Sequence, residues 1–181
     1  MSKENENILE MRRIVKVFPG VKALDNVDFK VERGEVHCLI GANGAGKSTL
    51  MKILSGAYTE DGGEICFDGR ILSPHGTQKR REEGISVIYQ ELSLFNELTV
   101  GENVYINNYP KKADGLIDWK KVYQQTQDLA DSLNIKVNAK AKISDLNVGQ
   151  RQLTEIMKAL ACNARLIVMD EPSSTLSQSE F

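Results

Sequence analysis

The chain has 181 residues, of which 23 are Lys or Arg and 25 are Asp or Glu, and its formal net charge is −2. This balance excludes the broad electrostatic attraction to nucleic acid that a basic domain has, so no nucleic-acid partner is expected. No apolar run approaches the length of about 18 residues that a membrane-spanning helix needs. Residues 1–7 are polar and lack the apolar region of a signal peptide. These features predict a globular protein of the cytoplasm.

The first predicted elements are two strands joined by a turn. Residues 8–17 and 27–31 have the composition of strands, and the second of them alternates apolar and polar side chains. Residues 19–20, Pro-Gly, are a turn signal that leaves Phe18 at the end of the first strand.

Residues 41–49, GANGAGKST, fit the pattern G-x-x-x-x-G-K-[ST], which is typical of a loop that holds a polyphosphate. The apolar run from Val36 to Ile40 predicts a buried strand before this P-loop, and residues 50–54 have helical spacing after it. Glycines let successive backbone N–H groups point inward at the positive end of the helix, where they bind phosphate. Lys47 would then reach the β- and γ-phosphates, and the Ser48 hydroxyl would ligate Mg²⁺. The residues predicted to bind ATP through this loop are Gly41, Asn43, Gly44, Gly46, Lys47, Ser48 and Thr49.

Strands and helices follow the P-loop. Residues 63–71 predict an antiparallel pair of strands, residues 74–84 a short charged helix, and residues 85–89 a strand. Apolar side chains recur at helical spacing from Trp119 to Leu133, which predicts one amphipathic helix. Because no strong strand pattern occurs in residues 91–146, this stretch is interpreted as a helical insertion.

The best-specified helix covers residues 147–161. Asn147 and Gln150 have the spacing of a capping box, in which Asn accepts from the first-turn N–H groups. The cysteines have no metal-ligand spacing and are expected to be small apolar core residues in a reducing compartment. They are Cys38, Cys66 and Cys162.

A candidate Mg²⁺ ligand follows the last predicted strand. The apolar residues 166–169 predict a buried parallel strand, and Asp170 comes at its carboxyl end, where open α/β sheets bind ligands. Asp170 is therefore predicted to hold Mg²⁺ from the side opposite the P-loop. The adjacent Glu171 would polarise an attacking water.

These motifs resemble those of ABC-transporter ATPase subunits. Lys47, Gln90, residues 146–150 (the signature segment) and residues 166–172 occur in the order and rough spacing of that family. The resemblance implies an α/β fold, with a P-loop NTPase (RecA-like) core, an antiparallel β-subdomain and a helical insertion.

The implied domain division has three parts. Residues 1–90 would hold the antiparallel β-subdomain and the P-loop part of the core. Residues 91–146 would form the helical subdomain with the signature segment at its end, and residues 147–181 would return to the core.

The resemblance also implies residue roles. Phe18 matches the aromatic residue that stacks on adenine, and Gln90 matches the residue that contacts Mg²⁺ or the attacking water and couples to the membrane subunit. The signature residues would reach the γ-phosphate of a nucleotide held by the opposite subunit: Asn147, Gly149 and Gln150. The implied catalytic residues are Glu171 as base, Lys47 and Gln90, and the implied metal ligands are Ser48, Gln90 and Asp170.

A narrower resemblance points to the first cassette of bacterial monosaccharide-import ATPases. It rests on residues 18–24, residues 90–94 and a signature segment with Val before Gly. It implies uptake of ribose, galactose or xylose-like sugars, at the inner face of the cell membrane. The implied partners are a second ATP-binding cassette, transmembrane permease subunits and, indirectly, a periplasmic or lipid-anchored sugar-binding protein. The alternatives are a cassette of another importer class or a non-transport ABC ATPase.

Two departures from the family pattern stand out. Asn147 occupies the place of the usual signature Ser, so its contact with the γ-phosphate would differ in geometry. The chain stops at Phe181, before the family's switch histidine, and neither His37 nor His75 is at that position. The chain is therefore expected to be a truncated first cassette that is nearly inactive alone.

Two other classes of P-loop protein fit less well. A small-metabolite kinase would need an arginine-bearing lid, and residues 91–146 contain no Arg. Chromosome-maintenance relatives carry a long coiled coil in the insertion, which is too short for one here, and translation-type relatives are basic.

Overall fold

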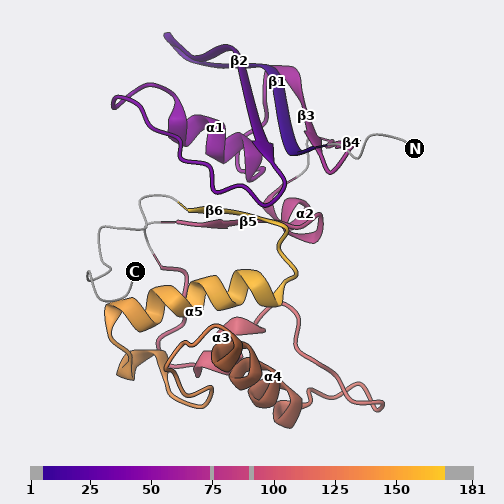
Figure 1. Cartoon of the computed structure of the whole chain (residues 1–181), viewed down its shortest axis with the longest axis vertical. Coiled ribbons are helices and arrows are strands. Elements are labelled where there is room, and N and C mark those ends of the chain that lie inside the picture. The colour runs from indigo at the N-terminus through magenta and orange to yellow at the C-terminus, as the bar shows by residue number, and fades with distance from the viewer. Residues whose placement is uncertain (1–5, 74–75, 90–91, 170–181) are drawn as a thin grey trace. The chain divides into compact units, whose positions relative to one another are not determined.

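The computed structural model describes residues 6–73, 76–89 and 92–169 (Figure 1). The chain divides into two compact units, Met1–Glu83 and Gly84–Phe181. The division into three domains expected from the resemblance stays a prediction.

The first unit contains an antiparallel sheet of four strands, in the order β2-β1-β3-β4. The strands are β1 (Asn7–Phe18), β2 (Val21–Glu32), β3 (Gly62–Phe67) and β4 (Arg70–Ile71). The predicted strands and the turn between the first two are confirmed, and Phe18 pairs with Val21 across that turn. β2 is longer than the predicted 27–31, because it pairs with β1 along almost its whole length.

The helices of the first unit are α1 (Lys47–Leu54) and α2 (Thr77–Glu82). The predicted helix after the P-loop is confirmed, and its buried residues, Leu50, Ile53 and Leu54, lie on one face because they are three and four positions apart. The helix ends at Leu54 with Ser55 as its C-cap, and Gly56 follows with a φ of 75° and donates its N–H to the Ile53 carbonyl.

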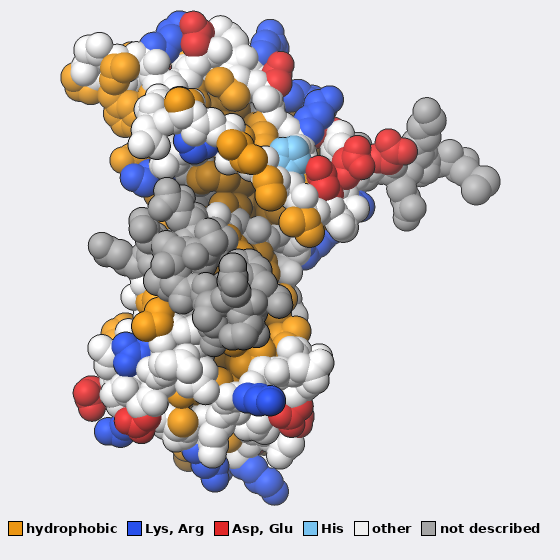
Figure 2. Space-filling view, turned by 60° about the vertical axis from the view of Figure 1, so that its left-hand side comes forward, with side chains coloured by type: hydrophobic (Ala, Val, Ile, Leu, Met, Phe, Trp, Pro, Cys, Tyr) orange, Lys and Arg blue, Asp and Glu red, His pale blue; other side chains and the backbone are white. Residues whose placement is uncertain are grey.

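The prediction of a buried strand from Val36 to Ile40 is wrong. This segment forms no strand, and the exposed fractions of Val36 and Ile40 are 93% and 90%. A strand needs a hydrogen-bonded partner, and the edge strands of the sheet in this unit, β2 and β4, do not pair with it. Figure 2 shows hydrophobic side chains at the surface of this unit.

The prediction that the cysteines are core residues is also wrong for Cys38. It lies within the exposed segment, whereas Cys66 and Cys162 are partly buried. The error has the same origin as the strand error, because Cys38 was placed in the core only by its apolar neighbours.

The second unit contains a parallel pair of strands, β5 (Ile85–Ile88) and β6 (Leu166–Met169). Its helices are α3 (Val100–Val104), α4 (Trp119–Ser132), a 3-10 turn (Ile143–Asp145) and α5 (Val148–Ala161). The predicted parallel strand is confirmed in direction, but it is only partly buried and Met169 is 42% exposed. Helix α3 was not predicted, although Thr99 and Glu102 form a capping box at its start.

The core of the second unit lies between α3, α4 and α5. It is a cluster of buried side chains: Val100, Val104, Ala130, Ile135, Val137, Ile143, Leu146 and Met157. The predicted amphipathic helix is confirmed as α4, although Trp119 and Leu133 at its ends are 42% and 40% exposed. Among the described residues, no helix has both the length and the apolar character needed to cross a bilayer.

Candidate functional site

The P-loop forces an unusual backbone path into helix α1. Gly44 and Gly46 have φ values of 82° and 89°, in the left-handed region that favours glycine. A Cβ added at Gly46 would lie 2.7 Å from both the Ala23 carbonyl oxygen and Leu24 Cδ2, so a side chain does not fit there. Because Gly46 is the N-cap, no side-chain oxygen caps the first N–H groups of α1. This helix end is therefore suited to an anionic ligand.

The Lys47 ammonium lies over the backbone of the same loop. Its Nζ donates to the carbonyl oxygens of Gly41 at 2.6 Å and Ala42 at 2.9 Å. Ser48 and Thr49 follow in the first turn of the helix, and the Ser48 side chain is exposed. Asn43 occupies the exposed turn of the loop. The structure thus brings the predicted loop residues together, while their roles stay predictions.

Phe18, the predicted adenine-stacking residue, forms an aromatic pair. Its ring meets the Tyr58 ring edge-on, with centroids 5.5 Å apart. Lys16 Nζ lies 5.7 Å from the Phe18 ring centre, and Lys52 Nζ lies 5.5 Å from that of Tyr58. Tyr58 was not singled out in the sequence, because its pairing with Phe18 depends on two segments far apart in the chain.

The signature segment forms the start of helix α5. Asn147 Oδ1 accepts from the Gln150 N–H at 2.8 Å, and Gln150 Oε1 accepts from the Asn147 N–H at 3.2 Å. The predicted capping box is therefore confirmed. Gly149 is buried, and Gln150 Nε2 also donates to the Lys136 carbonyl at 3.1 Å. The neighbouring Arg151 donates to the carbonyl oxygen of Leu146 at 3.0 Å, which fixes the backbone before the helix.

The predicted residues Gln90, Asp170 and Glu171 lie outside the described residues. The strands that precede them are described, and Ile88 at the end of β5 lies opposite Met169 at the end of β6. Because the strands are parallel, their carboxyl ends are at the same edge of the pair, which is the placement that the sequence predicted for a ligand site.

A buried carboxylate, which the sequence did not reveal, joins α5 to the segment after β5. Glu155 is 7% exposed, and its Oε1 accepts from the Ser93 N–H at 2.6 Å and from the Ser93 hydroxyl at 2.9 Å. Lys158 completes the cluster by donating to the Ser93 carbonyl at 3.0 Å. The only sequence signal was a Glu and a Lys on the inner face of an amphipathic helix.

Comparison with known families gives a direct result. The sequence profile described as "ABC transporter" matches residues 24–174. The chain belongs to the ABC transporter family. The match spans the P-loop, the signature segment and the strand β6, so the predicted family is confirmed.

The ABC transporter proteins most similar in sequence include three named for sugar import. The chain is 52% identical to a xylose import ATP-binding protein of Thermoanaerobacter pseudethanolicus, over 97% of this chain and 35% of that protein. It is 50% identical to a ribose import ATP-binding protein of Rubrobacter xylanophilus, over 96% of this chain and 34% of that protein. It is 48% identical to a galactose/methyl galactoside import ATP-binding protein of Clostridium perfringens, over 98% and 34%. The chain therefore spans about a third of the length of these relatives.

A solved structure supports the fold. An ATP-binding cassette of an ABC transporter, in its ADP conformation, has a TM-score of 0.82 and 30% identity, over 96% of this chain and 72% of that one. The nucleotide-free form of an ATP-binding cassette has the same TM-score at 29% identity, with the same coverage of both chains. The predicted P-loop NTPase fold class is thus confirmed.

Proposed function

We propose that this chain is the ATP-binding and ATP-hydrolysing part of an ABC importer that takes up a monosaccharide. ATP binding is supported by the geometry of the P-loop. Its glycines set the backbone path into α1, and Lys47 lies over that backbone. The identities of 48% to 52% with three sugar import proteins support the monosaccharide.

In the proposed reaction, the chain positions ATP for in-line attack by water. The N–H groups of the P-loop and Lys47 hold the β- and γ-phosphates, and Phe18 stacks on adenine. The signature segment of a partner cassette covers the γ-phosphate, and Glu171 orients the attacking water. Positioning and charge stabilisation supply most of the acceleration in phosphoryl transfer.

The donor chemistry of the P-loop fits Mg²⁺. The Ser48 hydroxyl is exposed in the first turn of α1, beside Lys47, and Mg²⁺ prefers oxygen ligands. Together with Ser48, Gln90 and Asp170 would hold the ion. When bound, the ion would neutralise charge on the phosphates.

The proposed partners follow from the same assignment. They are a second ATP-binding cassette, transmembrane permease subunits and, indirectly, a periplasmic or lipid-anchored sugar-binding protein. The chain would act at the cytoplasmic face of the membrane as a peripheral subunit.

Titration with fluorescently labelled ATP tests the nucleotide site. Lys47→Ala should weaken binding by about 10- to 100-fold, because hydrogen bonds to a charged group are lost. Lys30→Ala removes an exposed lysine from β2 and serves as the control, with binding expected within about twofold of wild type. Equal binding by wild type and Lys47→Ala would refute the site.

Hydrolysis tests the activity in the complete protein together with its membrane partners. Glu171→Gln should keep ATP binding but lower turnover by about 10²- to 10⁴-fold, because general-base assistance is lost. Turnover near the wild-type rate in this variant would remove Glu171 from the mechanism.

A further inference from the structure

A short irregular segment, residues 134–139, lies in the chain between helix α4 and the signature segment. Ile135, Val137 and Ala139 are buried, whereas Lys136 and Asn138 between them are exposed. Burial of alternate side chains fixes which side of the segment faces the core. Hydrogen bonds must then fix the position of its backbone polar groups.

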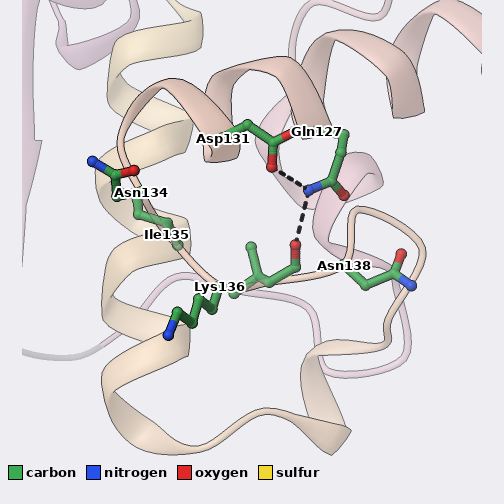
Figure 3. A pocket seen from close by; sticks show the side chains of 7 residues that line it. Gln127, Asp131, Asn134, Ile135, Lys136 and Asn138 are labelled. Carbon is green, nitrogen blue, oxygen red and sulfur yellow. Dashed lines mark hydrogen bonds between the residues drawn. The ribbon is translucent and has the colours of Figure 1, made fainter.

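Gln127 of α4 bonds this segment at two backbone atoms. Its Nε2 donates to the Val137 carbonyl at 3.2 Å, and its Oε1 accepts from the Ala139 N–H at 3.1 Å. The same Nε2 donates to the Asp131 carboxylate one helical turn further along, at 2.9 Å. Figure 3 shows the Gln127 amide between Asp131 and the segment. One side chain thus ties helix α4 to both sides of residue 138.

The same segment is bonded by the signature residue Gln150. Its Nε2 donates to the Lys136 carbonyl at 3.1 Å, while its Oε1 accepts from the Asn147 N–H at 3.2 Å. The carbonyl groups of two successive residues therefore accept hydrogen bonds from two different helices, that of residue 136 from α5 and that of residue 137 from α4. We infer that Gln127 is a positioning residue for the signature segment, because it fixes the backbone on which Gln150 rests.

Packing alone does not hold this segment on its outer side. Residues 134–138 border an open hollow of about 610 Å³, together with Gln127 and Asp131 (Figure 3). Since Lys136 and Asn138 are exposed here, the segment packs tightly only through its buried side. Loss of the Gln127 bonds would let the backbone shift toward the hollow, and the bond from Gln150 would shift with it.

The inference rests on the proposed function, in which the signature segment contacts ATP held by a partner cassette. A displaced Gln150 would disturb closure over the γ-phosphate. It would leave ATP binding at the P-loop unchanged, because the P-loop belongs to the first unit.

Amide hydrogen exchange in the chain itself tests the link without any assumption about activity. Gln127→Met keeps the length of the side chain but removes its hydrogen bonds. It should speed exchange of the Gln150 and Arg151 N–H groups by about fivefold. The matched control is Gln124→Met on the same helix. Gln124 donates to Asp128 at 2.8 Å, one helical turn away, as Gln127 does to Asp131. Unlike Gln127, it makes no hydrogen bond to the segment 134–139 among the described residues.

Gln124→Met should leave exchange at these two amides within about twofold of wild type. Equal exchange in the Gln127→Met and Gln124→Met variants would overturn the inference. Gln127→Glu replaces Gln127→Met if the latter does not fold. It keeps the acceptor for the Ala139 N–H and loses the donor to Val137 and to Asp131, and the same results support or overturn the inference.

A double-mutant cycle in the complete, partner-bound protein tests the consequence for hydrolysis. Gln127→Met should lower kcat by about fivefold, with labelled-ATP binding within about twofold of wild type. Combined with Gln150→Ala, it should cause no further loss beyond the more severe single variant, because both act through one link. Multiplying effects would overturn the inference. A wild-type complex without hydrolysis would instead refute the proposed function, and the exchange result would still decide the link.

Discussion

Helices α1 and α5 begin in opposite ways, although both are proposed to face the phosphates of ATP. α1 starts after Gly46, which has no side chain to cap it, so its first N–H groups can meet a ligand directly. α5 starts at Asn147, where the side chains of Asn147 and Gln150 bond each other's backbone N–H groups. The uncapped end suits a ligand bound within its own unit. The self-capped end keeps its shape without nucleotide, and so suits a ligand presented by another molecule.

The largest expected effect comes from giving α1 a side chain where it has none. Gly46→Ala combines a φ of 89° with a Cβ only 2.7 Å from the Ala23 carbonyl oxygen, so the loop must move. Binding of labelled ATP should fall by at least about 100-fold, because strain and displacement both act on the phosphate cradle.

Gly44→Ala separates these two causes. Gly44 has a φ of 82°, but a Cβ there would meet nothing within 4 Å. Only backbone strain remains, and ATP binding should weaken by about 10-fold. If the two variants bound ATP equally, close approach at Gly46 would play no part in the P-loop.

A smaller effect is expected from removing the cap of α5. Asn147→Ala loses the bond to the Gln150 N–H, which should lower the free energy of unfolding by about 1 kcal/mol. Asn147→Ser should recover most of it, since Ser is also a good cap. Thermal unfolding measures both, and labelled-ATP binding to the P-loop of the isolated chain should be unchanged. Weaker ATP binding in Asn147→Ala would show that the two helix ends are not independent.

The parts of the molecule that the sequence predicted correctly depend on neighbours in the chain. The capping box joins Asn147 to Gln150, and the helix after the P-loop and the turn at residues 19–20 are equally local. Such features are fixed by short-range geometry, which a single sequence carries.

Most of the parts that the sequence missed depend on distant partners; helix α3, whose capping box joins Thr99 to Glu102, is an exception. The apolar residues 36–40 satisfy the pattern of a buried strand, but a pattern does not name the strand that would pair with them. The bonds from Ser93 to Glu155, across 62 positions, and from Gln127 to the segment 134–139 are likewise invisible to periodicity. Each needs the fold before its partner can be identified.

The smallest expected effect is a pH dependence of the nucleotide-binding unit. Among the described residues, the carboxyl groups with lowered pKa lie in the first unit: Glu10, Asp25, Glu35 and Asp61. The Val17 N–H and then Lys16 lower the pKa of Asp61, next to Phe18. Since the unfolded pKa is about 3.9, the stabilisation is complete above about pH 4 to 5 and is lost as the pH falls through the lower folded pKa.

Asp61→Asn should therefore show a smaller fall of the thermal midpoint between about pH 5 and pH 3 than wild type. Asp25→Asn should likewise reduce the fall of the thermal midpoint over this pH range, because Lys22 lowers the pKa of Asp25. The two variants should differ in ATP binding at neutral pH. Asp61→Asn removes the ion pair with Lys16 and weakens the bond that Val17 donates, beside the Phe18–Tyr58 pair, so it should weaken binding slightly, whereas Asp25→Asn should not. If the thermal midpoint of Asp61→Asn fell with pH as steeply as that of wild type, the ionised Asp61 carboxylate would not stabilise this unit.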